Sequence, residues 1–167
     1  MKNLRQFLAC LAAFGFLTVP ATSGPKQPFS LAIAQPKQPV RAGTELRLRI
    51  TVTNTNDKPI SFITSPGPIP DDGLRYEVNV TDEQGHQAPA SAYLRTRDSR
   101  IPTNYGSSFA RTLRPGESFV DEVTVTAFYD LSRPGEYRIW VARRMPPRQA
   151  LGTGRVRSNV VNVMIVP

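Results

Sequence analysis

Residues 113–142 constrain the fold most, because they predict a strand, a corner and a second strand. Their apolar side chains recur at every second position, which places them on one face of a β-strand. In the first strand these are Phe119, Val123 and Val125, and in the second they are Tyr137, Ile139 and Val141. Between the strands, Pro134-Gly135 favours a turn. This pattern predicts sheet rather than helix for the centre of the domain.

The corner between these strands resembles the tyrosine corner of immunoglobulin-like sandwiches. In that motif a tyrosine just inside a strand bonds its hydroxyl back to the corner, and a core residue follows two positions later. Here the two residues are Tyr137 and Ile139, and because Ile139 stands where some such domains have cysteine, the resemblance implies no disulfide. We expect Tyr137 to be buried, with its hydroxyl bonded to the backbone of residues 130–133.

The rest of the chain repeats the same kind of short alternating segment between turn residues. Strands are predicted at residues 29–34, 45–54, 59–63, 74–82, 109–113 and 158–166, with a further short strand at 91–94. No stretch has a helical apolar period, and no repeat of 20–50 residues is present. We therefore predict an all-β fold, an immunoglobulin-like antiparallel β-sandwich of seven or eight strands.

The first 23 residues predict a secretory signal peptide, followed by a linker at 24–28 and the sandwich at 29–167. Lys2 and Arg5 precede an apolar run over residues 7–19, and small residues follow it. A retained membrane anchor is the rival interpretation, but the run is shorter than the roughly 20 residues that span a bilayer. We therefore expect a periplasmic or extracellular protein with no transmembrane segment after processing.

The cysteine and histidine content narrows the chemistry. The only cysteine, Cys10, lies within the apolar run, so the processed protein has no thiol nucleophile and no disulfide. The only histidine, His86, follows a glycine turn and has no recognisable catalytic partner. Asp71 and Asp72 suit a turn better than a calcium site, which needs six to eight oxygen ligands. We predict no catalytic residues, no metal and no cofactor.

Asp121 and Glu122 do not form the opposed carboxylate pair of a glycosidase, because alternation sends them to opposite faces of one strand. Asp121 then shares the inward face with Phe119 and Val123. This placement requires either a bulge or an interior partner such as an arginine.

Positive charge is the main candidate for binding. The formal net charge is +8, mostly from arginine, which suits anionic envelope polymers or lipid head groups but also suits a merely solvated basic rim. Candidate binding arginines flank the loop after residue 142 or lie in the irregular segment near residue 100. They are Arg143, Arg144, Arg148, Arg155, Arg157, Arg97 and Arg100. Pro146-Pro147 should stiffen the first of these segments.

Trp140 is the remaining candidate for binding. It lies on the outward side of its strand if Tyr137, Ile139 and Val141 face inward. An exposed tryptophan marks a contact site, although packing beneath a long loop at residues 65–73 would explain it equally well.

With the strands placed, the pattern resembles two families of small sandwich domains. The resemblance is carried by Ala42-Gly43-Thr44-Glu45-Leu46, Val52-Thr53-Asn54, Leu113…Pro115-Gly116-Glu117, Tyr129-Asp130-Leu131-Ser132…Pro134-Gly135-Glu136-Tyr137 and Ser158-Asn159. It is similar to the immunoglobulin-like prodomains of deuterolysin-type metallopeptidases and to the bacterial intracellular proteinase inhibitor family. The peptidases themselves need a His-Glu-x-x-His helix, which one histidine cannot supply.

These observations predict an exported, non-catalytic binding or accessory module that contacts another protein at the cell envelope. An inhibitor-like or chaperone-like role is what the resemblance implies. The first alternative is a binder of anionic polysaccharide or lipid head groups through the arginine loops. The second alternative is an uncharacterised hydrolase. We do not expect a nucleic-acid partner.

Overall fold

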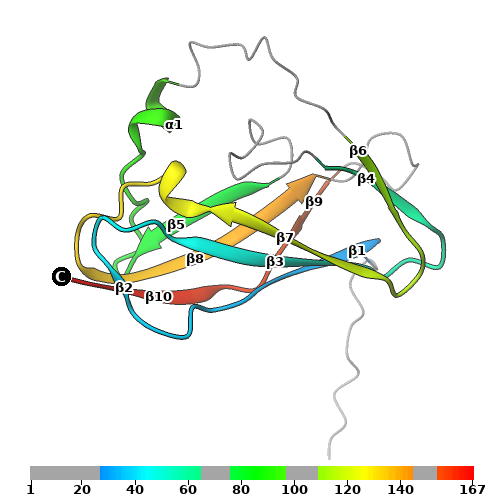
Figure 1. Ribbon diagram of the computed structural model, residues 1–167, viewed down its shortest axis with the longest axis horizontal. Helices are drawn as coiled ribbons and strands as arrows, with labels where there is room; N and C mark the ends of the chain where they lie inside the picture. Colours follow the sequence, from blue (N-terminus) through cyan, green and yellow to red (C-terminus); the bar gives the residue numbers. More distant parts are fainter. Residues whose placement is uncertain (1–26, 65–75, 97–108, 145–153) are drawn as a thin grey trace, which may run out of the picture.

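The computed structural model describes residues 27–64, 76–96, 109–144 and 154–167, which form two facing β-sheets (Figure 1). The first sheet has the order β1-β3-β7, formed by Phe29–Ile33, Arg47–Asn54 and Ser118–Thr124. The second has the order β2-β10-β8-β5, formed by Val40–Arg41, Val161–Val166, Gly135–Arg144 and Glu77–Asp82, and β9 (Arg155–Arg157) also pairs with β8. Among the strands of the described residues, only β2 and β10 pair in parallel. The predicted immunoglobulin-like sandwich is thereby confirmed.

The core lies between the two sheets because alternate residues of each strand point inward. In β3 the burial alternates from Arg47 to Asn54, with Leu48, Ile50 and Val52 almost fully buried. In β8 the inward positions are occupied by Tyr137, Ile139 and Val141. This is the period of two that the sequence predicts, and it leaves the intervening side chains on the outer faces.

A two-stranded ribbon extends the first sheet at one end of the sandwich. It consists of β4 (Ile60–Thr64) and β6 (Phe109–Leu113), drawn at the right in Figure 1. Phe62 of β4 packs edge-on against Phe29 of β1, with ring centroids 5.2 Å apart, and also against Phe119 of β7. The ribbon therefore contributes its own aromatic side chain to the common core.

Asn54 fixes the bend from which this ribbon leaves the sheet. Its side chain is fully buried and donates hydrogen bonds to the carbonyl oxygens of Lys58 and Leu113, both at 2.9 Å. Its Oδ1 accepts a third bond, from the N–H of Asn56. One amide thus bonds the turn before β4 to the end of β6, where the regular ladder is interrupted.

The corner before β8 has the expected geometry. The Tyr137 side chain is buried, and its hydroxyl donates a hydrogen bond to the carbonyl oxygen of Arg133 at 3.0 Å. This bond satisfies a backbone acceptor at the point where the chain turns into the strand.

The structure differs from the sequence prediction in several short elements. The strand predicted at 91–94 is wrong, because Ala92–Thr96 forms the short helix α1. A 3-10 turn occupies Val125–Ala127, directly after β7. The described residues contain ten strands rather than seven or eight, since the short β2 and β9 add to the count. Among these same residues, no helix is long and apolar enough to cross a membrane.

Candidate binding surface

The outer face of the second sheet carries Trp140 near its middle. Trp140 lies on β8 between inward-facing Ile139 and Val141, so its indole points away from the core and is half-buried. The guanidinium of Arg157, on β9, lies over the indole with its central carbon 3.9 Å from the ring centroid. The predicted outward orientation of Trp140 is confirmed. The side chain that covers it is an arginine, which adds a cation–π attraction.

Two of the predicted arginines on this face are paired with a single acid. The Oε1 atom of Glu77, on β5, lies 3.1 Å from Arg155 Nη2 and 3.4 Å from Arg144 Nε. Both arginine side chains remain more than half exposed, so these pairs contribute little to stability. They do neutralise part of the positive charge at this edge of the sheet.

One exposed apolar side chain, that of Val160, lies opposite the tryptophan. Val141 bonds to Ser158, and Ile139 is paired with Val161, so two residues, Asn159 and Val160, lie opposite Trp140 in a β-bulge. Asn159 directs its amide to β1, where it accepts from the N–H of Ile33 and donates to the carbonyl oxygen of the same residue.

Val160 is left 47% exposed, and Met164 on the same outer face of β10 is 45% exposed. Arg138 and Asn79 complete the surroundings of Trp140, at the preceding outward position of β8 and directly across on β5. We call this set, Trp140, Arg157, Arg138, Asn79, Val160 and Met164, the Trp140 face.

The prediction that Arg143 lies in an exposed basic loop is wrong. It is 5% exposed and points into the core, because β8 continues to Arg144 and keeps Arg143 on the same side as Ile139 and Val141. Its Nη1 donates a hydrogen bond to the Tyr76 hydroxyl at 2.9 Å. Its guanidinium lies 4.9 Å from the ring centroids of both Phe62 and Tyr76. Arg143 therefore belongs to the interior and not to an exposed binding loop.

The interior arginine accompanies the inward-facing carboxylate that the sequence singled out. Asp121 of β7 lies close enough to the Tyr76 hydroxyl to hydrogen-bond it, and Arg143 bonds the same hydroxyl. Burial raises the pKa of Tyr76, and the positive charge of Arg143 opposes that rise only in part. Asp121, Tyr76 and Arg143 thus form one polar cluster between the two sheets, which supplies the interior partner expected for Asp121.

Three of the predicted binding residues, Arg97, Arg100 and Arg148, lie outside the described residues, as do Asp71 and Asp72. His86 is exposed in its turn, with Nδ1 3.4 Å from Asp82 Oδ2. In the described part of the chain, no three His, Cys, Asp or Glu side chains are grouped closely enough to hold a metal ion.

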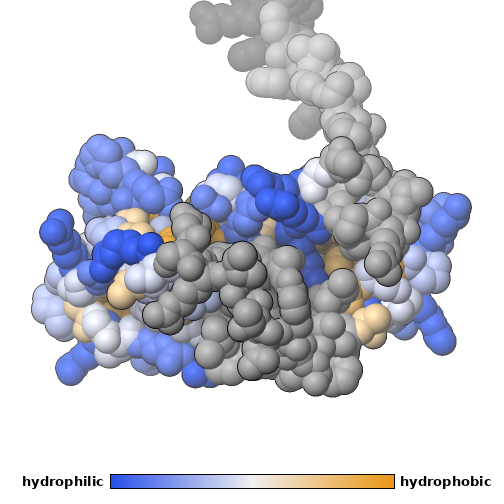
Figure 2. Space-filling model, turned by 90° about the horizontal axis from the view of Figure 1, so that it is seen from above, coloured by the Kyte–Doolittle hydropathy of each residue, from blue (hydrophilic) through white to orange (hydrophobic). Residues whose placement is uncertain are grey.

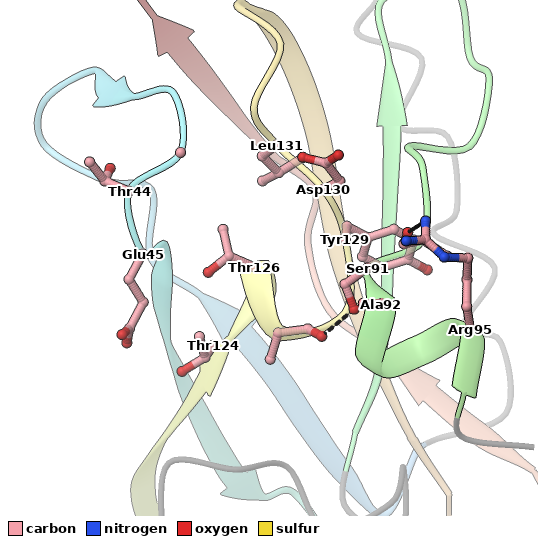
Figure 3. A pocket seen from close by; sticks show the side chains of 13 residues that line it. Thr44, Glu45, Ser91, Ala92, Arg95, Thr124, Thr126, Tyr129, Asp130 and Leu131 are labelled. Atoms are coloured by element: carbon pink, nitrogen blue, oxygen red, sulfur yellow. Dashed lines mark hydrogen bonds between the residues drawn. The ribbon is translucent and has the colours of Figure 1, made fainter. Parts of the chain in front are cut away.

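An open pocket of about 450 Å³ lies at the end of the sandwich near α1 (Figure 3). Thr44 and Glu45 line one side, Thr124 and Thr126 the middle, and Ser91, Arg95 and Asp130 the other side, as Figure 3 shows. Sequence reasoning missed this pocket because its residues come from three separate segments and share no motif.

The carboxylates of this pocket are both held in their charged form. The hydrogen bond and charge of Arg47 lower the pKa of Glu45, and hydrogen bonds from Ser132 lower the pKa of Asp130. Ser91 Oγ is occupied by bonds to Ala127 and Leu94, and Thr126 Oγ1 accepts from the N–H of Leu46. The pocket thus offers two anions, one cation and few unused hydroxyl groups.

Comparisons with known proteins add little to this description. No family model and no curated protein matches the sequence. Among solved structures, a β-glucosidase from Listeria innocua aligns in its glucose complex with 14% identity and a TM-score of 0.40, and in its gluconolactone complex with 15% and 0.39. Each alignment covers 83% of this chain, which spans only 16% of the glucosidase chain.

The ASH/PapD-like domain 7 of human CEP192 also aligns, with 13% identity and a TM-score of 0.37, over 93% of this chain and 96% of that domain. At such scores the likeness supports no inference about function.

Proposed function

We propose that this chain is an exported, non-catalytic module that binds another protein at the cell envelope through its Trp140 face. The observation that carries the proposal is the stacked pair of Trp140 and Arg157 on an outer sheet face, with exposed Val160 in the bulge beside it and exposed Met164 farther along the same face, across from Glu136. Tryptophan and arginine are the residue types most enriched at the centres of protein interfaces. Exposed aliphatic neighbours would supply the apolar area around such a centre.

The other surfaces offer less for such a role. The outer face of the first sheet carries mainly small and charged side chains, with Val120 as its one exposed large apolar residue. On the side shown in Figure 2, the visible described residues are mostly hydrophilic, and hydrophobic colours occupy small separate areas. The Trp140 face is therefore the better candidate among the described surfaces.

A binding role also fits the chemistry of the end pocket better than catalysis does. A hydrolytic pair of carboxylates needs one member that stays protonated near neutral pH. Glu45 and Asp130 both have lowered pKa values and would not supply that proton. Export is proposed from the basic residues and apolar run at the N-terminus of the sequence. The inhibitor-like or chaperone-like role remains what the family resemblance implies.

A matched pair of variants tests the proposal. Val160 and Val120 are valines of almost equal exposure, 47% and 50%, on the outer faces of opposite sheets. The mature domain, immobilised, is used to capture partners from a detergent-solubilised envelope extract. We expect wild type and Val120→Asp to retain the same partner and Val160→Asp to lose it. Equal capture by the two variants would place the binding surface elsewhere.

A further inference from the structure

We infer that the Trp140 face recognises an acidic, partly apolar segment of its protein partner, with carboxylates bound by Arg157 and Arg138. This inference rests on the proposed function and adds the chemistry of the partner. It follows from the way the charges on this face are paired.

The arginines on this face differ in whether a carboxylate neutralises them. Four arginines surround Trp140 on this face: Arg138, Arg144, Arg155 and Arg157. Glu77 neutralises part of the charge of Arg144 and Arg155. Within the described residues, neither Arg138 nor Arg157 forms an ion pair, and both are exposed. The positive charge nearest the tryptophan that Glu77 does not neutralise is therefore that of Arg138 and Arg157, and the carboxylate on the same face of β8, Glu136, lies beyond Arg138 from Trp140.

The contact with Trp140 fixes the orientation of the Arg157 guanidinium. Its guanidinium is held flat against the indole of Trp140, 3.9 Å from the ring centroid. A stacked guanidinium keeps its N–H groups at the edge of the plane, where they remain available for two parallel bonds to a carboxylate. Stacking also removes much of the rotamer freedom that a long side chain would otherwise lose on binding. Arg157 is thus prepared to bind a planar anion.

The spacing of Arg138 and Trp140 along β8 matches that of alternate residues in an extended peptide. Arg138 and Trp140 occupy consecutive outward positions of β8, about 7 Å apart along the strand. Alternate residues of an extended peptide have the same spacing, so carboxylates two residues apart in the partner reach Arg138 and Arg157 together. The aliphatic stems of these acidic side chains would meet Val160, and an apolar side chain at the next alternate position of the peptide, on the same side, would meet Met164. This mixture of charged and apolar contacts favours a protein segment over a purely anionic polymer.

The sequence provides a direct reporter for this interaction, because Trp140 is the only tryptophan in the chain. The processed protein is titrated with a short peptide in which two glutamates and a leucine occupy successive alternate positions with serines between them, and with a matched peptide that carries glutamine in place of glutamate. We expect a saturable change in Trp140 fluorescence with the glutamate peptide alone, and a loss of affinity as the salt concentration rises.

Arg138→Ser and Arg49→Ser remove the same charge from exposed mid-strand positions on opposite outer faces, so the second is the control for the first. We expect Arg138→Ser and Arg157→Ser each to weaken the glutamate peptide by about tenfold, and Arg49→Ser to leave it unchanged.

The inference would be overturned by an equal response to both peptides, by no saturable response, or by unchanged affinity in Arg138→Ser and Arg157→Ser. Tighter binding of an anionic polysaccharide or of vesicles containing anionic lipid would overturn it too. If the peptide test fails in any of these ways while Val160→Asp alone still loses the captured envelope partner, the proposed function stands and only the acidic chemistry is wrong. If Val160→Asp and Val120→Asp capture equally, the proposed function fails as well.

Discussion

Arg143 is a charged side chain in an apolar core, and its surroundings explain how the fold tolerates it. The guanidinium donates to the Tyr76 hydroxyl and lies between the rings of Phe62 and Tyr76, while Asp121 approaches the same hydroxyl from the opposite sheet. A buried charge is strongly unfavourable without such partners. The three polar groups therefore depend on one another.

We predict that Arg143→Ala lowers the free energy of unfolding by about 3 kcal/mol, because the buried Tyr76 hydroxyl loses a donor and the positive charge beside Asp121 is removed. Arg144 is the next residue and is exposed, so Arg144→Ala should change it by less than about 0.5 kcal/mol. Urea denaturation of both variants measures the difference. Similar stabilities would show that Arg143 is not the donor on which the interior cluster depends.

A second residue-scale prediction concerns the corner. Tyr137→Phe should lower the free energy of unfolding by about 1–2 kcal/mol, because the carbonyl oxygen of Arg133 loses its hydrogen-bond donor. Tyr93 is 38% exposed and serves as the control, since Tyr93→Phe should have little effect. An unchanged denaturation midpoint for Tyr137→Phe would contradict the role of this hydroxyl.

At the residue scale, two features of the sequence each predict part of this polar cluster. The alternation of Tyr137, Ile139 and Val141 implies an inward Arg143 as soon as β8 is allowed to continue. Asp121 requires an interior partner by the same alternation. Because of the paired prolines at 146–147, the sequence predicts a loop after residue 142. Arg143 is then expected outside the strand and apart from Asp121. Asp121 and Arg143 come together through the packing of the two sheets, which the periodicity of a single strand cannot predict.

At the scale of elements, the ribbon of β4 and β6 depends on Asn54. Its fully buried amide bonds Lys58 before β4, Leu113 in β6 and Asn56 in the turn, and the bond to Leu113 is buried. We predict that Asn54→Ala lowers the free energy of unfolding by about 2–3 kcal/mol, since the buried carbonyl oxygen of Leu113 and two backbone groups of the turn lose their partner.

Asn56→Ala is the matched control for Asn54, because the side chain of Asn56 makes only an exposed bond to the next residue, Asp57. The two variants are compared by chemical denaturation. If they were equally stable, the bend would be held by packing of Phe62 rather than by the Asn54 amide.

Short elements were the hardest to predict, for reasons visible in the structure. Ser91 begins α1 by accepting a hydrogen bond from the N–H of Leu94, which is an N-cap signal available in the sequence. The segment contains too few residues for an apolar period, so Tyr93 and Leu94 suggested a strand instead. The three residues of β9 become a strand only because β8 extends beside them. Local pattern predicted the long strands well because their inward faces repeat.

At the scale of the whole molecule, the first test concerns export. The chain should be cleaved so that the mature protein begins between Thr22 and Gly24 and lacks Cys10, because the apolar run is too short to remain as a membrane anchor. N-terminal sequencing and intact mass of the protein recovered from the cell envelope measure this. A new N-terminus at an acylated Cys10, or retention of the complete leader in the membrane fraction, would contradict the soluble exported form.

We expect the partner to cover the Trp140 face. Oxidative footprinting measures which side chains the partner covers. Trp140 and Met164 are readily oxidised and lie on that face, whereas Tyr93 is exposed on α1, outside it. The mature protein is oxidised with hydroxyl radicals alone and in complex with its captured partner. We expect the partner to protect Trp140 and Met164 and to leave the oxidation of Tyr93 unchanged. Protection of Tyr93 with Trp140 and Met164 still fully reactive would contradict this expectation.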